Sequence, residues 1–454
     1  MPVSEGIRQS GTLGQVIKKL LPQGKTTVFK AQLRILPSVA FISAFLNNTP
    51  VVVIFAPIIK HWAKSVNLPA TKFLIPLSYV TILGGICTLI GTSTNLVVHG
   101  MILEAGFEGF SMFELGKVGV FIAIAGIIYI FLFSKRLLPD ARPDTAVPDE
   151  EVEEGEKLHR VEAVLGARFP GINKKLKDFN FQRHYGAEVK EIKTRNGQRF
   201  VTNLDDVVLH EGDTLVVMAD DTFIPTWGES SVFVLLTNGN EPDTSGKKKR
   251  WFALLLLVLM IVGATVGELP VTKEMFPDIK LDMFFFVSIT TIIMAWTNLF
   301  PARKYTKYIS WDILITIACA FAISKAMVNS GVADSVAKFI IGLSDDYGPH
   351  VLLAMVFIIT NLFTELITNN AAAALAFPLA LSISAQLGVS PTPFFVVICM
   401  AASASFSTPI GYQTNLIVQG IGNYKFTDFV RIGLPLNIIT FLISIILIPL
   451  IWNF

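Results

Sequence analysis

The sequence predicts a polytopic α-helical membrane protein that consists of two inverted repeats with re-entrant hairpins and broken helices, and a small α/β insert between them. Composition, a row of apolar segments and two matching polar strings support this prediction. Of the 454 residues, 52% are hydrophobic and only 16% are charged, and the mean hydropathy is +0.58. A soluble domain carries about 25% charged residues. The net charge of +2 gives no indication of a nucleic-acid-binding surface.

Ten apolar segments are long enough to cross a bilayer, or to enter it as part of a broken helix. They lie near residues 35–59, 73–90, 118–138, 251–269, 281–300, 309–328, 350–367, 371–387, 392–410 and 429–452. Several are short or are interrupted by Gly, Pro or Asn. Re-entrant hairpins explain such segments better than simple membrane spans do.

Two polar strings within apolar sequence match each other. One is Ser43-Ala-Phe-Leu-Asn-Asn-Thr-Pro50, and the other is Thr364-Glu-Leu-Ile-Thr-Asn-Asn-Ala371. In each, an apolar run leads from an asparagine, Asn48 or Asn369, to a proline nine residues later. Hydrocarbon does not tolerate unpaired amides, so polar strings of this kind indicate a function.

Each string is followed by a second one, Gly91-Thr-Ser-Thr-Asn95 in the first half and Gly411-Tyr-Gln-Thr-Asn415 in the second. The spacing agrees, because 47 residues separate Asn48 from Asn95 and 46 separate Asn369 from Asn415. Paired, broken polar segments in corresponding halves of a chain are typical of transporter binding sites.

These patterns divide the chain into five parts. They are a first membrane repeat at 1–139, an acidic linker at 140–156, an insert at 157–240, a basic linker at 241–250 and a second membrane repeat at 251–454. The second repeat has 80 residues before a motif at Gly331 that resembles the one at Gly11, which only ten residues precede. We therefore expect the first repeat to be incomplete at its N-terminus, and a longer upstream reading frame would support this.

The insert alternates apolar and polar residues as strands do, at Val161–Leu165, Ala187–Lys193 and Thr214–Ala219. Asn196-Gly197 and Glu211-Gly212-Asp213 are typical of tight turns. Basic residues flank the insert on both sides, at Lys135-Arg136 and in the cluster 247–250. The positive-inside rule then predicts a multi-pass protein of the cell (inner) membrane with a cytoplasmic insert.

The polar strings suggest how a small dianion could be bound. The first N–H groups of a helix are unpaired, and its dipole places about half a positive charge there. Two such termini at the membrane midplane, with Asn and Thr donors, can bind carboxylate or sulfate without a buried Lys or Arg. The residues expected to line the substrate site are Asn48, Thr49, Thr94, Asn95, Asn369, Asn370, Thr414 and Asn415.

The same loops offer carbonyl and side-chain oxygens, which are hard ligands suited to Na⁺. One sodium site is expected at Ser43, Asn48 and Gly91. Its partner is expected at Thr364, Asn369, Ser407 and Thr408. Glu365 is the one acid beside a hairpin tip, and it could tune the cation site, take part in proton coupling or form structural hydrogen bonds.

The strings resemble those of the divalent anion:sodium symporter family, within the wider ion transporter superfamily. Asn47-Asn48-Thr49 and Thr368-Asn369-Asn370 stand where that family carries Ser-Asn-Thr. The strings that end at Asn95 and Asn415 also match. Asn47 replaces the first Ser and Asn370 replaces the second Thr, and both changes alter side chains expected near the ligand.

The insert resembles a TrkA carboxy-terminal (RCK-C) domain in the stretches 169–171, 181–189 and 209–215. Related transporters usually carry two inserted domains, whereas this sequence has room for one. The resemblance implies Na⁺-coupled uptake of a small divalent anion such as sulfate or a C4-dicarboxylate, with H⁺ coupling possible. It also implies a homodimer and an elevator-type movement of the domain that holds the hairpins.

Two other readings remain open, a cation transporter or channel regulated by the RCK-like insert, and a truncated member that does not transport. A potassium pore would need a filter like Thr-Val-Gly-Tyr-Gly, and Gly411-Tyr412 is not followed by Gly. No nucleophile elbow, Walker loop, HExxH or dinucleotide fingerprint is present, so the sequence predicts no enzyme and no cofactor.

Overall fold

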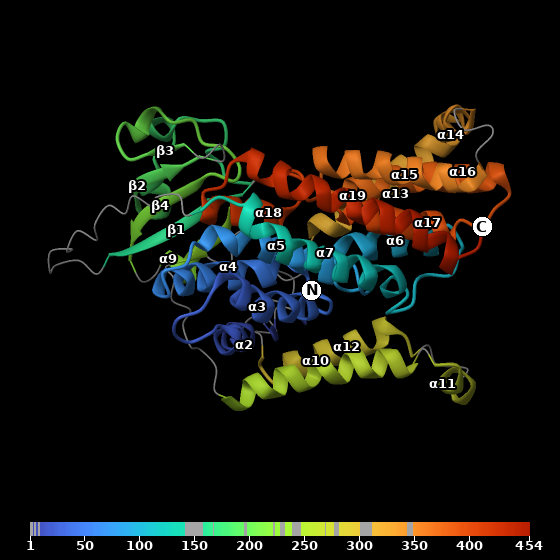
Figure 1. The fold of residues 1–454 in the computed structure, drawn as a ribbon, viewed down its shortest axis with the longest axis horizontal. Helices are drawn as coiled ribbons and strands as arrows, with labels where there is room; N and C mark the ends of the chain where they lie inside the picture. The colour runs from blue at the N-terminus through green and yellow to red at the C-terminus, as the bar shows by residue number, and fades with distance from the viewer. Residues whose placement is uncertain are drawn as a thin grey trace.

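A computed structural model describes most of the chain. The residues it leaves undescribed are 1–2, 4–5, 8–9, 141–157, 167, 195–197, 221–222, 228–231, 238–246, 268, 277–280, 300–310 and 343–347. Both linkers predicted around the insert fall largely in these gaps, and so does the predicted turn at Asn196-Gly197. The described part is mainly helical, with one small sheet at one end of an elongated helical body (Figure 1).

The two halves of the membrane part repeat one order of elements: a helical hairpin, a helix–break–helix segment and a long helix. In the first half these are α3 (Val28–Ser43), α4 (Asn48–Ser65), α5 (Leu74–Gly85), α6 (Ser93–Glu104) and α7 (Gly116–Leu137). In the second half they are α15 (Gly348–Leu366), α16 (Asn369–Leu387), α17 (Thr392–Ser403), α18 (Gln413–Gly422) and α19 (Phe426–Ile451). The chain breaks at the polar strings, as the sequence predicts.

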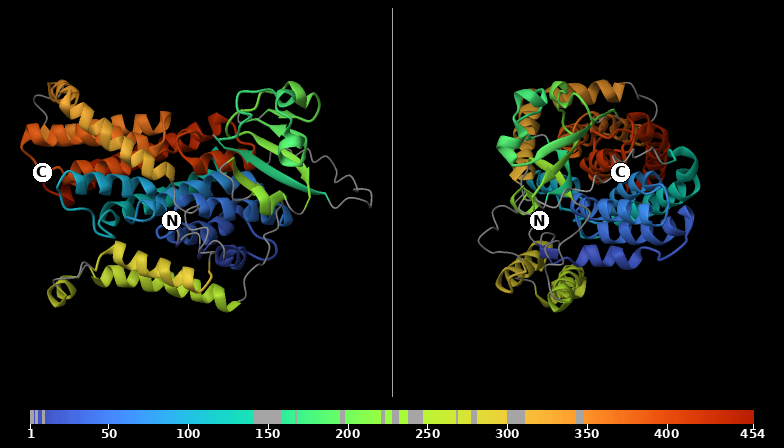
Figure 2. Two further views of the ribbon diagram at one scale, coloured as in Figure 1. Left: turned by 180° about the vertical axis from the view of Figure 1, so that it is seen from behind. Right: turned by 90° about the vertical axis from the view of Figure 1, so that its left-hand side faces the viewer.

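A shorter helix precedes each hairpin, α2 (Thr12–Leu20) in the first half and α14 (Val332–Gly342) in the second. Before α14 come α10 (Lys247–Gly267), α11 (Pro270–Met275), α12 (Met283–Trp296) and α13 (Trp311–Asn329). Figure 2 shows α10 and α12 side by side, as a pair that stands off from the helices carrying the polar strings. The basic cluster 247–250, predicted in a linker, instead forms the first turn of α10, because Lys and Arg are good helix formers.

Five of the described helices are long and apolar enough to cross a membrane. They are 116–137, 248–267, 348–366, 369–387 and 426–451. A sixth span is possible if α13 and α14, which meet at a bend of 71°, are counted together. The apolar side chains exposed along these helices, such as Ile128 and Leu442, are suited to lipid contact. These features are those of a multi-pass membrane protein.

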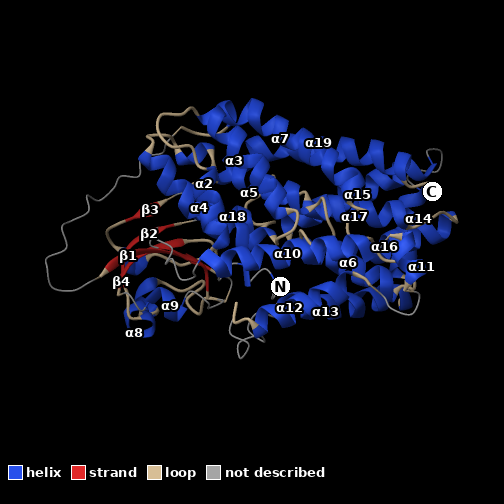
Figure 3. Ribbon diagram, turned by 90° about the horizontal axis from the view of Figure 1, so that it is seen from below, coloured by secondary structure: helices blue, strands red, loops and turns tan. Residues whose placement is uncertain are grey.

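The insert is a five-stranded antiparallel sheet with the strand order β3-β2-β4-β1-β5. Figure 3 shows the strands of this sheet in red, at one end of the helical body. Its strands are β1 (His159–Leu165), β2 (Glu188–Lys193), β3 (Arg199–Phe200), β4 (Thr214–Ala219) and β5 (Phe233–Thr237). The three strands predicted from alternation are β1, β2 and β4, which form the centre of the sheet. Gly212, at φ +83°, makes the predicted turn into β4.

The insert has its own core, which packs against the short helices α8 (Phe181–Tyr185) and α9 (Phe223–Trp227). Phe169 is its centre, with ring centroids 4.9 Å from Phe179 and 5.9 Å from Tyr185. Aromatic contacts of this kind add to the free energy gained from area burial. The insert therefore has the separate core of a small domain.

Candidate functional site

Four helices begin at the polar strings, and they pair across the two halves of the chain. Thr49 Oγ1, at the start of α4, donates a hydrogen bond to Gln413 Oε1, at the start of α18, over 3.2 Å. Thr94 Oγ1, at the start of α6, lies 3.2 Å from Asn370 Oδ1, at the start of α16. Each hairpin is thus joined at its break to the broken helix of the other half. The four N-termini gather partial positive charge in one region.

Side chains just before the hairpin helices cap them. Asn47 Oδ1 accepts a hydrogen bond from the Thr49 N–H, and Thr368 Oγ1 accepts one from the Ala371 N–H, each over 3.4 Å. Such caps satisfy one of the first unpaired N–H groups and leave others free for a ligand. Asn47, which replaces the serine of the related family, therefore acts here as a helix cap.

The two predicted cation sites share one hydrogen-bond pattern. Ser43 Oγ donates to Asn48 Oδ1 over 2.8 Å, and Thr364 Oγ1 donates to Asn369 Oδ1 over 2.8 Å. All four side chains are buried. The structure therefore brings together the oxygen atoms of each predicted pair, one from each arm of a hairpin.

Gly91 and Thr408 are members of the two predicted cation sites that lie in the unwound segments, and they approach the hairpin tips in different ways. Gly91 lies against Gly85, and Gly85 lies against the side chain of Asn48 so closely that an added Cβ would come within 2.5 Å of Oδ1. Thr408 Oγ1 donates to the backbone oxygen of Glu365 over 3.1 Å. The unwound backbone therefore approaches the hairpin tip closely in both halves.

Asn95 and Asn415 are fully buried and brace the unwound segments between the broken helices. Asn95 Nδ2 donates to the Thr88 carbonyl over 2.9 Å, and Asn415 Nδ2 donates to the Ser405 carbonyl over 2.9 Å. Their amide N–H groups thus bond to their own loops. Ser78, on α5, was not identified from the sequence, and its hydroxyl lies 2.7 Å from Asn415 Oδ1.

Thr414 is buried beside Asn415, and its hydroxyl lies 2.9 Å from Ser78 Oγ. Ser407 is engaged through its backbone N–H, which donates to Glu365, and through its hydroxyl, which accepts from Asn437. A role for these residues in binding substrate or sodium stays a prediction.

Tyr412 is the central residue that the sequence reasoning missed. Its hydroxyl accepts a hydrogen bond from Asn48 Nδ2 over 2.5 Å and lies 2.9 Å from Thr92 Oγ1. The Asn369 side chain also hydrogen-bonds this hydroxyl. Tyr412 thus connects the asparagines of both hairpin tips. Aligning the two follower strings would have indicated it, because Tyr412 stands where the first string carries Thr92.

The side chains at the four N-termini differ in burial. Asn48, Asn369, Thr92 and Tyr412 are buried, and we call these four the floor of the site. Thr49, Ser93 and Asn370 are partly exposed, and Gln413 is exposed. None of these eight side chains is charged, so a bound anion would be held by amides, hydroxyls and helix N-termini.

Comparison with known proteins identifies the family of this chain. The family model described as "Citrate transporter" matches residues 1–388 and, in an overlapping alignment, residues 279–454. The chain belongs to this citrate transporter family. Members of the family are transporters rather than enzymes.

The relatives include proteins named for sodium and sulfate. An uncharacterized transporter of Synechocystis sp. is 30% identical over 99% of this chain and 87% of its own length. Sodium/sulfate cotransporters 2 and 1 of Chlamydomonas reinhardtii are 31% and 30% identical over 62% of this chain and 31% of their own length. These relatives place the transporter among the divalent anion:sodium symporters.

The alignment with the Synechocystis relative runs over 537 positions, which exceeds the 454 residues of this transporter. The relative therefore carries residues within the aligned region that have no counterpart here.

Glu365 of the transporter accepts hydrogen bonds from neutral groups of two other segments. Its carboxylate accepts from the Ser407 N–H over 2.9 Å and from Asn437 Nδ2 over 2.7 Å. Asn437 lies in α19, and Ser407 lies in the unwound segment between α17 and α18. The carboxylate therefore ties the hairpin tip to both segments, which supports the structural role considered for it.

We expect Glu365→Ala to lower uptake, because it removes the oxygen that accepts from the Ser407 N–H and from Asn437 Nδ2. Glu365→Gln should keep at least half of the wild-type rate, since both bonds go to Oε1 and an amide oxygen in the same position can accept them. Initial uptake rates of the two variants across pH 6–8 would test this. If Glu365→Gln instead abolished uptake or its pH dependence, proton coupling would explain Glu365 better.

Proposed function

We propose that this protein is a secondary active transporter that couples Na⁺ entry to uptake of a small divalent anion, sulfate or a C4-dicarboxylate. The observation that supports it most is the convergence of the N-termini of α4, α6, α16 and α18 around a floor of neutral donors. Free N–H groups and aligned dipoles suit a compact anion with charge on several oxygens.

The proposal places one Na⁺ beside Ser43, Asn48 and Gly91, and a second beside Thr364, Asn369 and Thr408. The hydroxyl–amide pairs Ser43–Asn48 and Thr364–Asn369 support it, because their oxygens lie beside unwound backbone that offers carbonyl ligands. The names of the sodium/sulfate cotransporters among the relatives also favour Na⁺ as the coupling ion. Binding of cations next to the anion would lower the cost of burying its charge.

We further propose that the two halves are inverted repeats and that the hairpin-bearing domain moves in an elevator-type cycle within a homodimer. The repeated order of elements supports the first part. The family resemblance supports the other two. The insert would be a cytoplasmic RCK-C-like domain, which its small antiparallel sheet and the basic residues on its flanks favour.

Proteoliposomes that contain the purified protein would test the function. Radiolabelled sulfate uptake would be measured under an inward Na⁺ gradient and under a matched K⁺ gradient. Unlabelled succinate, citrate and arsenite would be added as competitors. Uptake that needs Na⁺ would support the symporter, and the competition pattern would identify the anion class. Absence of uptake of sulfate and of labelled succinate, by protein shown to be folded, would contradict the proposal.

A further inference from the structure

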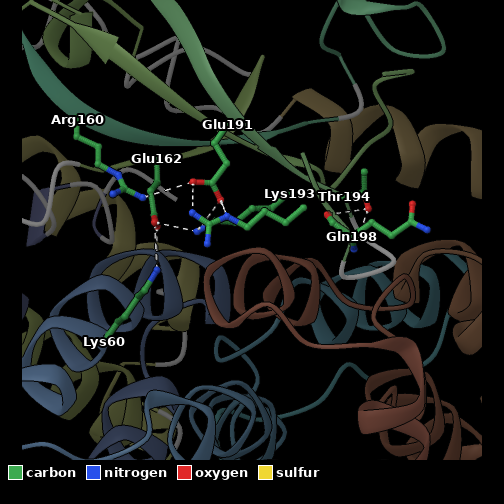
Figure 4. A network of polar contacts seen from close by, with 8 residues as sticks. Lys60, Arg160, Glu162, Glu191, Lys193, Thr194 and Gln198 are labelled. Carbon is green, nitrogen blue, oxygen red and sulfur yellow. Dashed lines mark hydrogen bonds and ion pairs between the residues drawn. The ribbon is translucent and has the colours of Figure 1, made fainter. Parts of the chain in front are cut away.

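The insert contacts the membrane helices through an ion pair to α4. Lys60 Nζ, in α4, lies 3.1 Å from Glu162 Oε1 and 3.2 Å from Oε2, both on β1 (Figure 4). The side chains of Lys60 and Glu162 are 23% and 17% exposed, so this pair is far less hydrated than a surface salt bridge. We call this contact, together with its surroundings on α4 and α18, the seat of the insert.

The ion pair belongs to a cluster on the face of the sheet that meets the membrane helices. Lys193 Nζ lies 3.4 Å from Glu162 and 3.9 Å from Glu191, and Glu191 also pairs with Arg160 and Arg199. Lys193 and Glu191 are only 5% and 4% exposed. Buried charges are tolerated when they are paired, and removing one partner is costly. Lys60 is the member of this cluster that comes from a membrane helix.

A close contact with α18 completes the seat. An added Cβ on Gly420, in α18, would come within 2.5 Å of Thr214 Oγ1 and 3.5 Å of Val164 in the insert. Leu416, one turn earlier in α18, packs against Gly212. Val164 is fully buried and belongs to the hydrophobic core of the membrane part. The sheet therefore lies directly on the helix, with little room for water between them.

Both helices of the seat begin in the candidate site. The first turn of α4 carries Asn48 and Thr49, and the first turn of α18 carries Gln413 and Thr414. Lys60 lies twelve residues beyond Asn48, which is about 18 Å along a helix. We infer that the insert is a coupling element whose seat holds α4 and α18 in the described arrangement, so that releasing the seat changes the rate of transport. This inference rests on the proposed function for its transport readout.

The ion pair at the seat can change the populations of the conformations of the transporter. A contact made in one conformation and stretched in the next stabilises the first, and removing it shifts the population away from that conformation. Because the seat contacts α4 and α18, it should slow the conformational change that moves these helices out of the described arrangement. Loss of the ion pair should raise the maximal uptake rate about threefold and change the half-saturating anion concentration by less than about twofold.

The seat should persist across the physiological pH range. Burial disfavours the ionised form of Glu162, but the charges of Lys60, Lys193 and Arg160 outweigh it and lower the pKa of Glu162 to about 2. An acid whose pKa is depressed in this way adds stability that is present above its ordinary pKa of about 4.3 and is lost as the pH falls towards 2. Glu191 is the other acid that faces this group. We expect amide hydrogen exchange of β1, corrected for its intrinsic pH dependence, to be unchanged between pH 5.5 and 8.

The test compares Lys60→Met, Glu162→Gln and the double variant with Lys64→Met, a matched control. Lys64 lies one turn further along α4 and is exposed. Initial rates of Na⁺-driven sulfate uptake would be measured in proteoliposomes with the full chain. Hydrogen exchange of α4, α18 and the insert would be followed on the same samples. We expect faster uptake and faster exchange in α4 and α18 for both single variants, and no further change in the double variant.

Uptake by Lys60→Met equal to or slower than uptake by Lys64→Met would overturn the coupling. So would an increase in exchange confined to the insert. If the wild-type protein transports neither sulfate nor succinate, the proposed function fails, and the hydrogen-exchange comparison still decides the inference. Faster hydrogen exchange in the first turns of α4 and α18, seen in Lys60→Met but not in Lys64→Met, would then support the link between the seat and the candidate site.

Discussion

Asn48→Ala and Asn369→Ala are each expected to abolish Na⁺-driven anion uptake while expression stays normal. Each change removes a buried amide that contacts a hydroxyl on its own hairpin and the hydroxyl of Tyr412. A buried polar group left without a partner costs about 1–3 kcal/mol. Each change also removes a predicted ligand of both the anion and one Na⁺, so the loss of uptake should exceed tenfold.

Asn329→Ala is the matched control for these two variants, because Asn329 is exposed at the end of α13. It should leave uptake unchanged. Size-exclusion profiles and thermal stability in detergent would show whether the hairpin variants fold. Retention of normal uptake by both Asn48→Ala and Asn369→Ala would remove these residues from the proposed site.

Tyr412→Phe is expected to weaken anion binding about tenfold or more, because it keeps the ring but removes the hydroxyl that connects the two hairpin tips. Asn48 Nδ2 and Thr92 Oγ1 would then lack this buried partner. A loss of about 1.4 kcal/mol corresponds to a factor of ten in affinity. The concentration of sulfate or succinate that gives half-maximal uptake would measure the effect, and its Na⁺ dependence would be recorded at the same time.

Tyr129→Phe provides the comparison for this hydroxyl. Tyr129 is also buried and donates to a backbone carbonyl, that of Ile432, over 3.0 Å, but it lies on α7 outside the polar strings. It should lower stability without changing the half-maximal concentration. Equal effects of Tyr412→Phe and Tyr129→Phe on anion affinity would show that Tyr412 has a structural role alone.

Two kinds of local pattern in the sequence predicted elements of the fold, namely polar residues within apolar runs and the alternation of apolar residues. Unpaired amides are costly in hydrocarbon, so Asn48 and Asn369 within apolar runs indicated breaks in the chain, and α4 and α16 begin at these residues. Alternation of apolar residues identified β1, β2 and β4, which form the centre of the sheet. Periodicity did not identify β3, which has two residues, because so short a strand shows no pattern.

The structure supplies three details that local sequence patterns do not show. Asn415 was expected to line the substrate site, yet its amide N–H₂ bonds to the loop that it braces. Nothing next to Tyr412 in the sequence distinguishes it from other aromatic residues. Its hydroxyl lies beside Asn48, 364 positions away, only in the folded chain. The basic cluster at 247–250 was assigned to a linker because charge alone does not distinguish a linker from a first helical turn.

Local hydropathy and residue chemistry are enough to indicate helices and their ends, so the amino-acid sequence indicates a membrane protein whose helices break at two matching polar strings. Which of these breaks lie together is visible only in the folded chain. The pairing of α4 with α18 and of α6 with α16, and the seat of the insert at Lys60, depend on how helices pack, which local patterns do not encode.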